Sequence, residues 1–270
     1  MKPAPFRYHR PQSLGEALAL LAELGADAKL IAGGQSLGPM MNMRLAQPAD
    51  LIDLNAIAGL DSIDEVHNFI EIGALTRHHA VASSPVIRKH CPLLAEAAQT
   101  IGHYAIRSRG TLGGSLAHAD PAAQLPLVAA TLGAEIAVAG PRGERRIAAG
   151  EFFVSLMTTA LERDEILVAV RFPKATPGER HAYLQFSRRT GDFAIVAVAC
   201  ALLNKKLKIG LGGVQDKPFV LSDLKSLDPA TVARAAREAV NPTENPRVPA
   251  VFRRELVEVL VKRAVARMIT

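Results

Sequence analysis

Ala32-Gly33-Gly34-Gln35-Ser36 directly follows a short apolar run, Ala28 to Ala32, that predicts a β-strand. Two consecutive glycines permit positive φ and allow a ligand to approach the backbone closely. Successive N–H groups in such a turn form a concave nest that suits a phosphate, and the Ser36 hydroxyl can add a further donor. Gly-Gly turns are common, so this segment alone leaves both a phosphate-binding loop and a plain structural turn open.

Thr111-Leu112-Gly113-Gly114-Ser115 repeats this design further along the chain. Two glycines are again followed by a hydroxyl, and the cations Arg107 and Arg109 precede them. Two such loops can embrace a pyrophosphate from opposite sides. Neither segment matches the dinucleotide fingerprint G-x-G-x-x-G or the phosphate loop that ends in Gly-Lys-Ser/Thr. A Rossmann or P-loop interpretation is therefore disfavoured, while phosphate binding is not.

The composition is that of an ordinary globular protein: among 270 residues, 49% are hydrophobic and 21% are charged. The first ten residues lack the apolar region of a secretory signal. The longest apolar run, Phe193 to Leu203, is far shorter than the roughly 20 residues of a membrane helix. We therefore expect a cytoplasmic chain without a membrane span. Cys91 and Cys200 alone cannot hold an iron–sulfur cluster or a structural zinc.

The net charge of +6 does not by itself indicate nucleic-acid binding, because acidic residues are interleaved almost everywhere. Three Tyr and no Trp leave little for base stacking, and we expect no nucleic-acid partner. The basic region 247–267 predicts a solvated helix face, with an acidic protein partner as the second interpretation. His78, His79, His103 and His118 lack the convergent spacing of a zinc site, so we expect no metal.

Periodicity and capping signals divide the chain into helices and strands. Ser13 and Glu16 form a capping box, and Gly25 is placed where that helix would stop. Asp120 and Pro121 read as the N-cap and first position of another helix. Helices are predicted at 14–24, 77–89, 92–101, 121–132, 229–240 and 251–268. Strands are predicted at 28–32, 50–54, 60–66, 69–73, 135–139, 145–148, 165–172, 182–187, 193–203 and 207–211.

Longer segments bearing these motifs resemble a known family. Ile31 to Arg44 resembles the first FAD loop of the medium subunits of molybdenum hydroxylases, and Arg107 to Pro121 resembles the second. The family includes the carbon monoxide dehydrogenase medium subunit and the FAD domain of xanthine dehydrogenase. Phe69–Ser83, Asp164–Leu167 and Tyr183–Ala194 also fit, in family order over nearly the whole chain.

The resemblance implies an α+β chain with a two-lobed FAD-binding fold and a small C-terminal domain. The FAD-binding domain is expected at 1–175, with a small α/β lobe at about 1–55 and a larger α+β lobe at 56–175. A linker rich in Pro, Gly and charge, Pro173 to Arg180, marks the boundary. The C-terminal α+β flavoprotein domain is expected at 176–270. FAD is expected between the lobes, bound non-covalently.

The resemblance also implies a set of cofactor-binding residues. In the family the first loop binds the FAD pyrophosphate through backbone amides, and the second completes that cradle. The implied residues are Ile31, Ala32, Gly33, Gly34, Gln35, Ser36, Leu37, Thr111, Leu112, Gly113, Gly114, Ser115, Asp120, Gln124, Leu167, Tyr183 and Gln185. For Asp120, Leu167 and Tyr183 a structural role remains open: a helix N-cap, a strand-core leucine and a half-buried strand tyrosine.

Two positions depart from the family pattern. Relatives usually carry an acidic residue that contacts the FAD where this chain has Gln124. They also place a lysine close to the pyrimidine edge of the flavin, where the candidates here are Leu184 and Gln185. A cation there would stabilise negative charge on the reduced flavin, and in this chain that contribution is missing unless Arg188 or Arg189 substitutes for the lysine.

The function implied is that of an FAD-binding electron-transfer subunit of a molybdopterin-dependent dehydrogenase or hydroxylase complex. In the family a molybdopterin large subunit oxidises the substrate and an iron–sulfur small subunit passes electrons to FAD, which reduces an external acceptor, NAD or a quinone or carrier. Molybdopterin and [2Fe-2S] clusters are expected only on partner subunits, and no catalytic side chain is expected here. The alternatives are a self-contained FAD-dependent oxidoreductase and a non-catalytic nucleotide-binding module.

Overall fold

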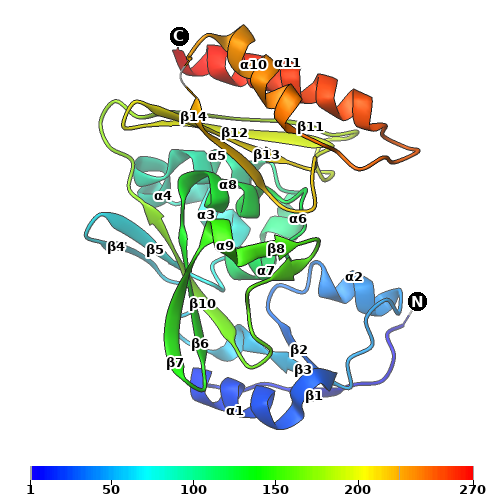
Figure 1. Cartoon of the computed structure of the whole chain (residues 1–270). Helices are drawn as coiled ribbons and strands as arrows, with labels where there is room; N and C mark the ends of the chain where they lie inside the picture. The colour runs from blue at the N-terminus through cyan, green and yellow to red at the C-terminus, as the bar shows by residue number, and fades with distance from the viewer. Residues whose placement is uncertain (1, 225, 270) are drawn as a thin grey trace.

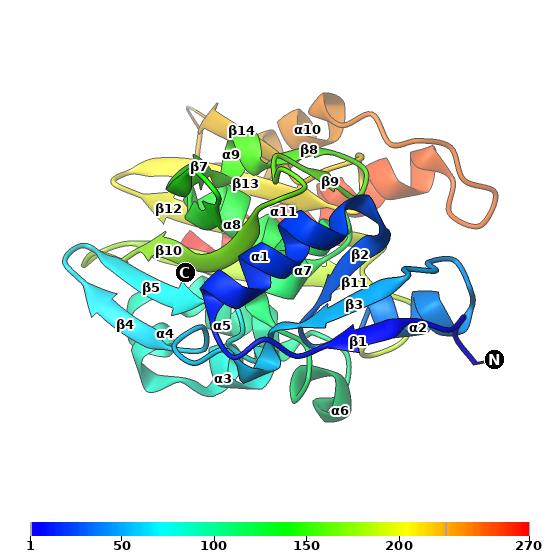
Figure 2. The same cartoon turned by 90° about the horizontal axis from the view of Figure 1, so that it is seen from below.

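The N-terminal lobe is a small parallel sheet flanked by short helices. In the computed structural model, which describes residues 2–224 and 226–269, strands β1 (Arg7–His9), β2 (Ala28–Ile31) and β3 (Asp50–Asp53) form a sheet of order β1-β3-β2 (Figures 1 and 2). Helix α1 (Leu14–Leu24) packs on it, while α2 (Leu37–Asn42) follows β2. Short 3-10 turns lie at Gly25–Asp27 and Leu54–Ala56.

The predicted capping box of α1 is confirmed. Ser13 Oγ accepts from the Glu16 N–H at 3.2 Å, and the Glu16 carboxylate accepts from the Gln12 N–H at 2.7 Å. Gly25 ends the helix with φ of +61°. The buried face of α1 carries Ala17 and Leu21, which join a core that includes residues of the larger lobe. This helix therefore fixes the small lobe against the larger one.

The larger lobe contains an antiparallel sheet of order β4-β5-β10-β6-β7. Its strands are β4 (Ile63–Val66), β5 (Phe69–Gly73), β6 (Glu135–Gly140), β7 (Gly143–Ala148) and β10 (Ile166–Pro173). Its helices are α3 (His78–Ser83), α4 (Pro85–His90), α5 (Pro92–Gln99), α6 (Tyr104–Arg107), α7 (Leu112–His118), α8 (Gln124–Leu132) and α9 (Ala149–Phe152). A hairpin of β8 (Phe153–Ser155) and β9 (Thr158–Thr159) follows α9. The predicted β4–β5 hairpin is confirmed, and His67 at its turn has φ of +49°.

The C-terminal layer is a second antiparallel sheet between two sets of helices (Figure 1). Its strands are β11 (Arg180–Phe186), β12 (Val196–Leu203), β13 (Lys206–Gly212) and β14 (Phe219–Leu224). Helices α10 (Pro229–Ala239) and α11 (Ala250–Ile269) cover its outer face, and α5 and α8 lie on its inner face. Strand β12 alternates accordingly: valines and Cys200 enter the outer core, whereas Ala197, Ala199 and Ala201 enter the inner one.

The predicted two-lobed α+β architecture with a small C-terminal α+β layer is therefore confirmed, with local corrections. The sequence did not predict strands β1, β8, β9 and β14 or the short helices α2, α6 and α9. The helix predicted at 77–89 is two helices, because Pro85 starts a new one that Ser84 caps. The helix predicted from Pro121 begins only at Gln124. Among the described residues, no helix is both long and apolar enough to span a membrane.

Gly210 on β13 allows α8 to pack closely on the C-terminal sheet. A Cβ there would overlap the Thr131 hydroxyl and stand 2.9 Å from Leu127 Cδ1, both on α8. We expect Gly210→Ala to lower the free energy of unfolding by about 2 kcal/mol in urea denaturation, because the added methyl overpacks this contact. Gly150→Ala, in open space on α9, is the matched control and should change little. Wild-type stability in Gly210→Ala would contradict this packing.

Candidate functional site

A cavity of about 650 Å³ lies between the two lobes and reaches the C-terminal layer. Its wall is built from the end of β2, the start of α2, the helix α7 and the start of β10. The loop 191–193, between β11 and β12, also lines it. Its volume is in the range of small-molecule and cofactor sites. Residues of both glycine motifs line this cavity.

Residues 33–37 form an amide nest on the small-lobe side of this cavity. Gly34 adopts positive φ, +67°, whereas Gly33 does not, so only the second glycine is needed for its conformation. Within the described part of the chain, nothing accepts a hydrogen bond from the backbone N–H groups of these five residues. Unpaired N–H groups in a concave turn favour an anionic ligand such as a phosphate.

The second motif is not the loop that the sequence predicted but the first turn of α7. Thr111 is its N-cap, with Oγ1 accepting from the Gly114 N–H at 3.1 Å. Neither glycine here has positive φ. Gly113 serves close packing instead, because a Cβ would stand 2.6 Å from the Cβ of Ala74. The amides of this turn already have acceptors, so the motif contributes to the cavity through the bare Gly114 and the Ser115 side chain.

The two motifs are joined by a direct backbone contact. A Cβ on Gly33 would overlap the Arg109 carbonyl and stand 2.8 Å from Gly110 Cα. Arg77 links the two motifs by hydrogen bonds. It donates to the Arg109 carbonyl and to Asn55 Oδ1, each at 2.6 Å. Asn55 Nδ2 in turn donates to the Ala32 carbonyl at 2.7 Å. Burial lowers the pKa of Arg77. Two features therefore set the distance between the motifs: the absence of a Cβ at Gly33 and the hydrogen bonds of the Arg77 guanidinium.

His78 anchors the segment before α7 and lines the cavity. Its backbone N–H donates to the Gly110 carbonyl, and its ring Nε2 lies 2.8 Å from the Thr111 carbonyl. A carbonyl only accepts, so Nε2 carries the proton. Burial lowers the pKa of His78 to about 4, and the ring is neutral at pH 7. Nδ1 is buried without a partner among the described residues.

The structure brings most of the predicted site residues to the cavity wall. Those that line it are Ile31, Ala32, Gly33, Gly34, Gln35, Ser36, Leu37, Thr111, Gly113, Gly114, Ser115, Asp120, Gln124 and Leu167. Leu112 lies in the hydrophobic core instead. Tyr183 and Gln185 lie behind Gln124 and do not line the cavity. Asp120 is not the helix N-cap that the sequence predicted, because its carboxylate accepts from the Ala122 N–H within a tight turn.

Other lining residues were not predicted as site residues, among them His78, Leu161, Glu165 and the segment from Gly191 to Phe193. From the sequence alone, His78 is weighed only as a metal ligand. No cluster of three or more His, Cys, Asp or Glu residues suited to a metal occurs in residues 2–224 and 226–269. The segment 191–193 comes from the C-terminal layer, and only tertiary structure reveals its place.

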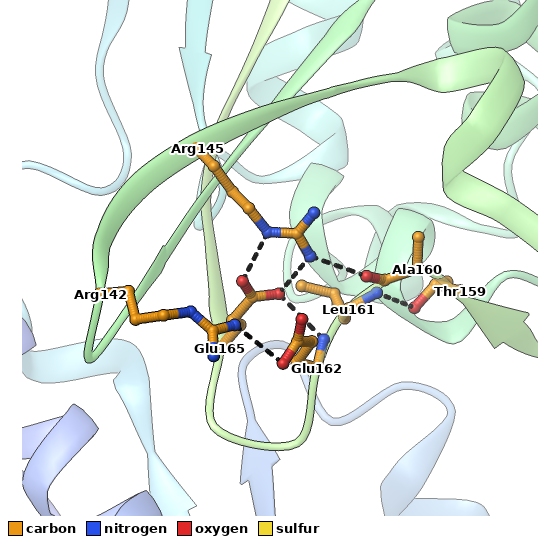
Figure 3. Close-up of polar contacts among 7 residues, drawn as sticks. All are labelled: Arg142, Arg145, Thr159, Ala160, Leu161, Glu162 and Glu165. Carbon is orange, nitrogen blue, oxygen red and sulfur yellow. Dashed lines mark hydrogen bonds and ion pairs between the residues drawn. The ribbon is translucent and has the colours of Figure 1, made fainter.

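An arginine–glutamate network holds the loop before β10, which forms part of the cavity wall (Figure 3). Glu165 accepts from Arg145 Nε at 2.6 Å, from Arg145 Nη2 at 2.8 Å and from the Glu162 N–H at 2.9 Å. Arg145 also donates to the Ala160 carbonyl, and Arg142 pairs with Glu162 at the surface. The hydrogen bonds from Arg145 lower the pKa of Glu165, although burial opposes this.

Two family models match the chain over nearly its whole length. Residues 4–175 match the FAD binding domain in molybdopterin dehydrogenase, and residues 181–268 match the CO dehydrogenase flavoprotein C-terminal domain. The chain belongs to this FAD-binding family. It is therefore an FAD-binding subunit of the oxidoreductase class.

Individual relatives agree. The chain is 40% identical to the 6-hydroxypseudooxynicotine dehydrogenase complex subunit alpha of Paenarthrobacter nicotinovorans, over 99% of this chain and 95% of the relative. It is 44% identical to the carbon monoxide dehydrogenase medium chain of Hydrogenophaga pseudoflava, over 76% and 71% respectively. The solved carbon monoxide dehydrogenase from Hydrogenophaga pseudoflava, which lacks the Mo-pyranopterin moiety of the molybdenum cofactor, superposes with a TM-score of 0.94 at 37% identity, covering 100% and 99% of the two chains.

The residues present fit the cofactor of the family. The amide nest offers several unpaired donors to a diphosphate. Gly114 lies on the opposite wall and, having no side chain, leaves space there for a ligand. A Cβ at this position would project into the gap between the two motifs, 4.0 Å from the Cβ of Ala32 and 2.7 Å from Thr111 Oγ1. Side chains that could accept or donate, such as Ser36, Ser115 and Gln124, line the remaining wall.

Gly33→Ala tests the contact between the motifs. Its methyl would strike the Arg109–Gly110 backbone and push the amide nest away from α7, so we expect FAD affinity to fall more than about 10-fold. Titration of the FAD-free chain, followed by quenching of flavin fluorescence, measures the dissociation constant. Gly15→Ala, in open space on α1, is the control and should bind as wild type does. Unchanged affinity in Gly33→Ala would rule out this role.

The lowered pKa of Glu165 leads to a second prediction, on how stability depends on pH. Because it is lowered from its ordinary value of 4.5, the ionised group stabilises the fold fully above that pH, and this contribution is lost as pH falls through the folded-state pKa. Glu165→Gln should lower the melting temperature by about 3 °C at pH 7 and by progressively less below pH 4.5. Glu162→Gln, at the more exposed pair, should change little. A pH-independent difference for Glu165→Gln would contradict the assignment.

Proposed function

We propose that the chain is the FAD-carrying medium subunit of a molybdopterin-dependent dehydrogenase or hydroxylase complex. In this proposal it receives electrons from an iron–sulfur small subunit and passes them to an external acceptor, either NAD or a quinone or carrier. A molybdopterin large subunit oxidises the substrate. The observation that carries the proposal is the unpaired amide nest of residues 33–37 facing the start of α7 across a cavity of about 650 Å³.

Bound FAD supplies the redox chemistry, and the side chains supply binding, orientation and shielding. We assign the diphosphate to the amide nest, with the Ser36 and Ser115 hydroxyls as further donors. Leu167 and Gln124 contribute an apolar and a polar wall. The segment from Gly191 to Phe193 covers the cavity from the C-terminal side.

The names of the relatives support the need for partners. Those relatives are a complex subunit and the medium chain of a carbon monoxide dehydrogenase. We propose that this chain likewise acts only with an iron–sulfur and a molybdopterin subunit, in the cytoplasm, where its two buried free cysteines would stay reduced. We further propose a FAD-binding domain at 1–175, with lobes at 1–55 and 56–175, and a flavoprotein domain at 176–270.

The rival of a self-contained oxidoreductase needs a general acid or base in the cavity that is free to act. Two of the titratable groups on its wall are committed elsewhere: His78 to the Thr111 carbonyl and Glu165 to Arg145. His118, Asp120 and Asp192 also line the cavity, so the activity of the lone chain decides between the two functions.

Purified chain should contain close to one FAD per molecule, released into the supernatant by acid precipitation because the attachment is non-covalent. Alone, it should oxidise no purine, N-heterocycle, aldehyde or carbon monoxide. Co-expression with an iron–sulfur subunit and a molybdopterin subunit should restore substrate oxidation and yield a complex that survives gel filtration.

Three results would count against the proposal. A chain without flavin would favour a nucleotide-binding module. Protein-bound flavin after acid treatment would exclude the non-covalent attachment. Efficient oxidation of an organic substrate by the lone chain would favour the self-contained oxidoreductase.

A further inference from the structure

Gln185 on β11 is the centre of a buried polar network that joins the C-terminal layer to the cavity wall. Its Oε1 accepts from the Tyr183 hydroxyl at 2.7 Å and from Gln124 Nε2 at 3.2 Å. Thr100 Oγ1 lies 3.2 Å from the same oxygen, but its one proton is donated to the Ala97 carbonyl at 2.8 Å. Thr100 ends α5 and Gln124 begins α8, so the groups around this oxygen come from three different elements. The Gln185 oxygen therefore links the sheet to α8 by a hydrogen bond and lies beside the end of α5.

Gln124 is the member of this network that reaches the cavity. Its side chain is 4% exposed and lines the cavity wall. While Nε2 donates to Gln185, no described residue donates to Gln124 Oε1. Nδ1 of His78 is fully buried without a partner, whereas Gln124 Oε1 is not among the fully buried unpaired atoms. The amide consequently presents an acceptor, rather than a donor, to whatever occupies the cavity.

The orientation of that amide depends on Gln185. A primary amide can turn its oxygen and its nitrogen about with little change in shape, so its surroundings decide which one faces the cavity. Burial raises the pKa of Tyr183, whose hydroxyl stays protonated and donates to Gln185 Oε1. With its oxygen held by Tyr183, Gln185 offers Gln124 an acceptor and requires Nε2 to point towards it.

We propose that Gln185, held by the Tyr183 hydroxyl, is a positioning residue for cofactor binding: it acts through Gln124, whose Oε1 accepts a hydrogen bond from an N–H or O–H group of the bound FAD. This rests on the proposed function, in which FAD fills the cavity. The C-terminal layer thus determines that Gln124, in the FAD-binding lobes, presents a hydrogen-bond acceptor to the cavity. Gln185 itself touches no cofactor.

The test is a double-mutant cycle on FAD affinity in the full-length chain. Gln124→Leu removes the acceptor and should weaken FAD binding about 10-fold, which is the loss expected for one buried hydrogen bond. Gln185→Leu frees the Gln124 amide to turn and should weaken binding about 5-fold. The double variant should bind no more weakly than Gln124→Leu, because Gln185 acts only through Gln124.

Gln185→Glu is the conservative variant that separates positioning from packing. Its carboxylate can still accept from Tyr183 and Gln124, so this variant should bind FAD at least twice as tightly as Gln185→Leu at pH 7. Multiplicative losses in the double variant, or equal binding by the Glu and Leu variants, would overturn the inference while leaving wild-type FAD binding intact. Failure of the wild-type chain to bind FAD would overturn the proposed function as well.

Discussion

The backbone of Gly33 lies against the backbone of Arg109 and Gly110 with no room for a Cβ, and the architecture of the cavity depends on this contact. It brings the end of a strand in the small lobe to the start of a helix in the larger lobe. The amide nest of residues 33–37 then faces α7 rather than solvent. Arg77 holds the contact by donating to carbonyl or amide oxygens on both sides. At this contact between the lobes, Gly33 is needed for the close approach of two backbones and not for a positive φ.

The C-terminal layer also has small residues where a helix packs closely on its sheet. Alanines on the inner face of β12 and Gly210 on β13 let α8 lie directly on the sheet. Because α8 begins at Gln124, this packing also fixes the cavity wall. The polar link from Gln124 to Gln185 runs through the same interface. The layer therefore supports the site from behind, and its segment 191–193 reaches the cavity directly.

Local signals predicted most elements, because capping boxes, turn residues and alternating patterns act over a few residues. They failed where a signal had two meanings. Gly113 and Gly114 read as a loop, yet Thr111 caps a helix that contains both. Asp120 read as a helix cap, yet it closes a turn three residues earlier. Strand β14 follows an irregular stretch, and its sequence does not alternate strictly between apolar and polar residues. The motifs predicted the glycine-rich side of the cavity, but the contribution of residues 191–193 depends on tertiary contacts that no local pattern encodes.

The role of the amide nest is tested most directly by a crystal structure of the chain with FAD bound. The account predicts diphosphate oxygens at hydrogen-bond distance, about 3 Å, from the backbone nitrogens of residues 33–37. The same structure should show the start of α7 on the opposite side of the diphosphate. A diphosphate bound elsewhere, with those nitrogens still unpaired or facing only water, would contradict the account.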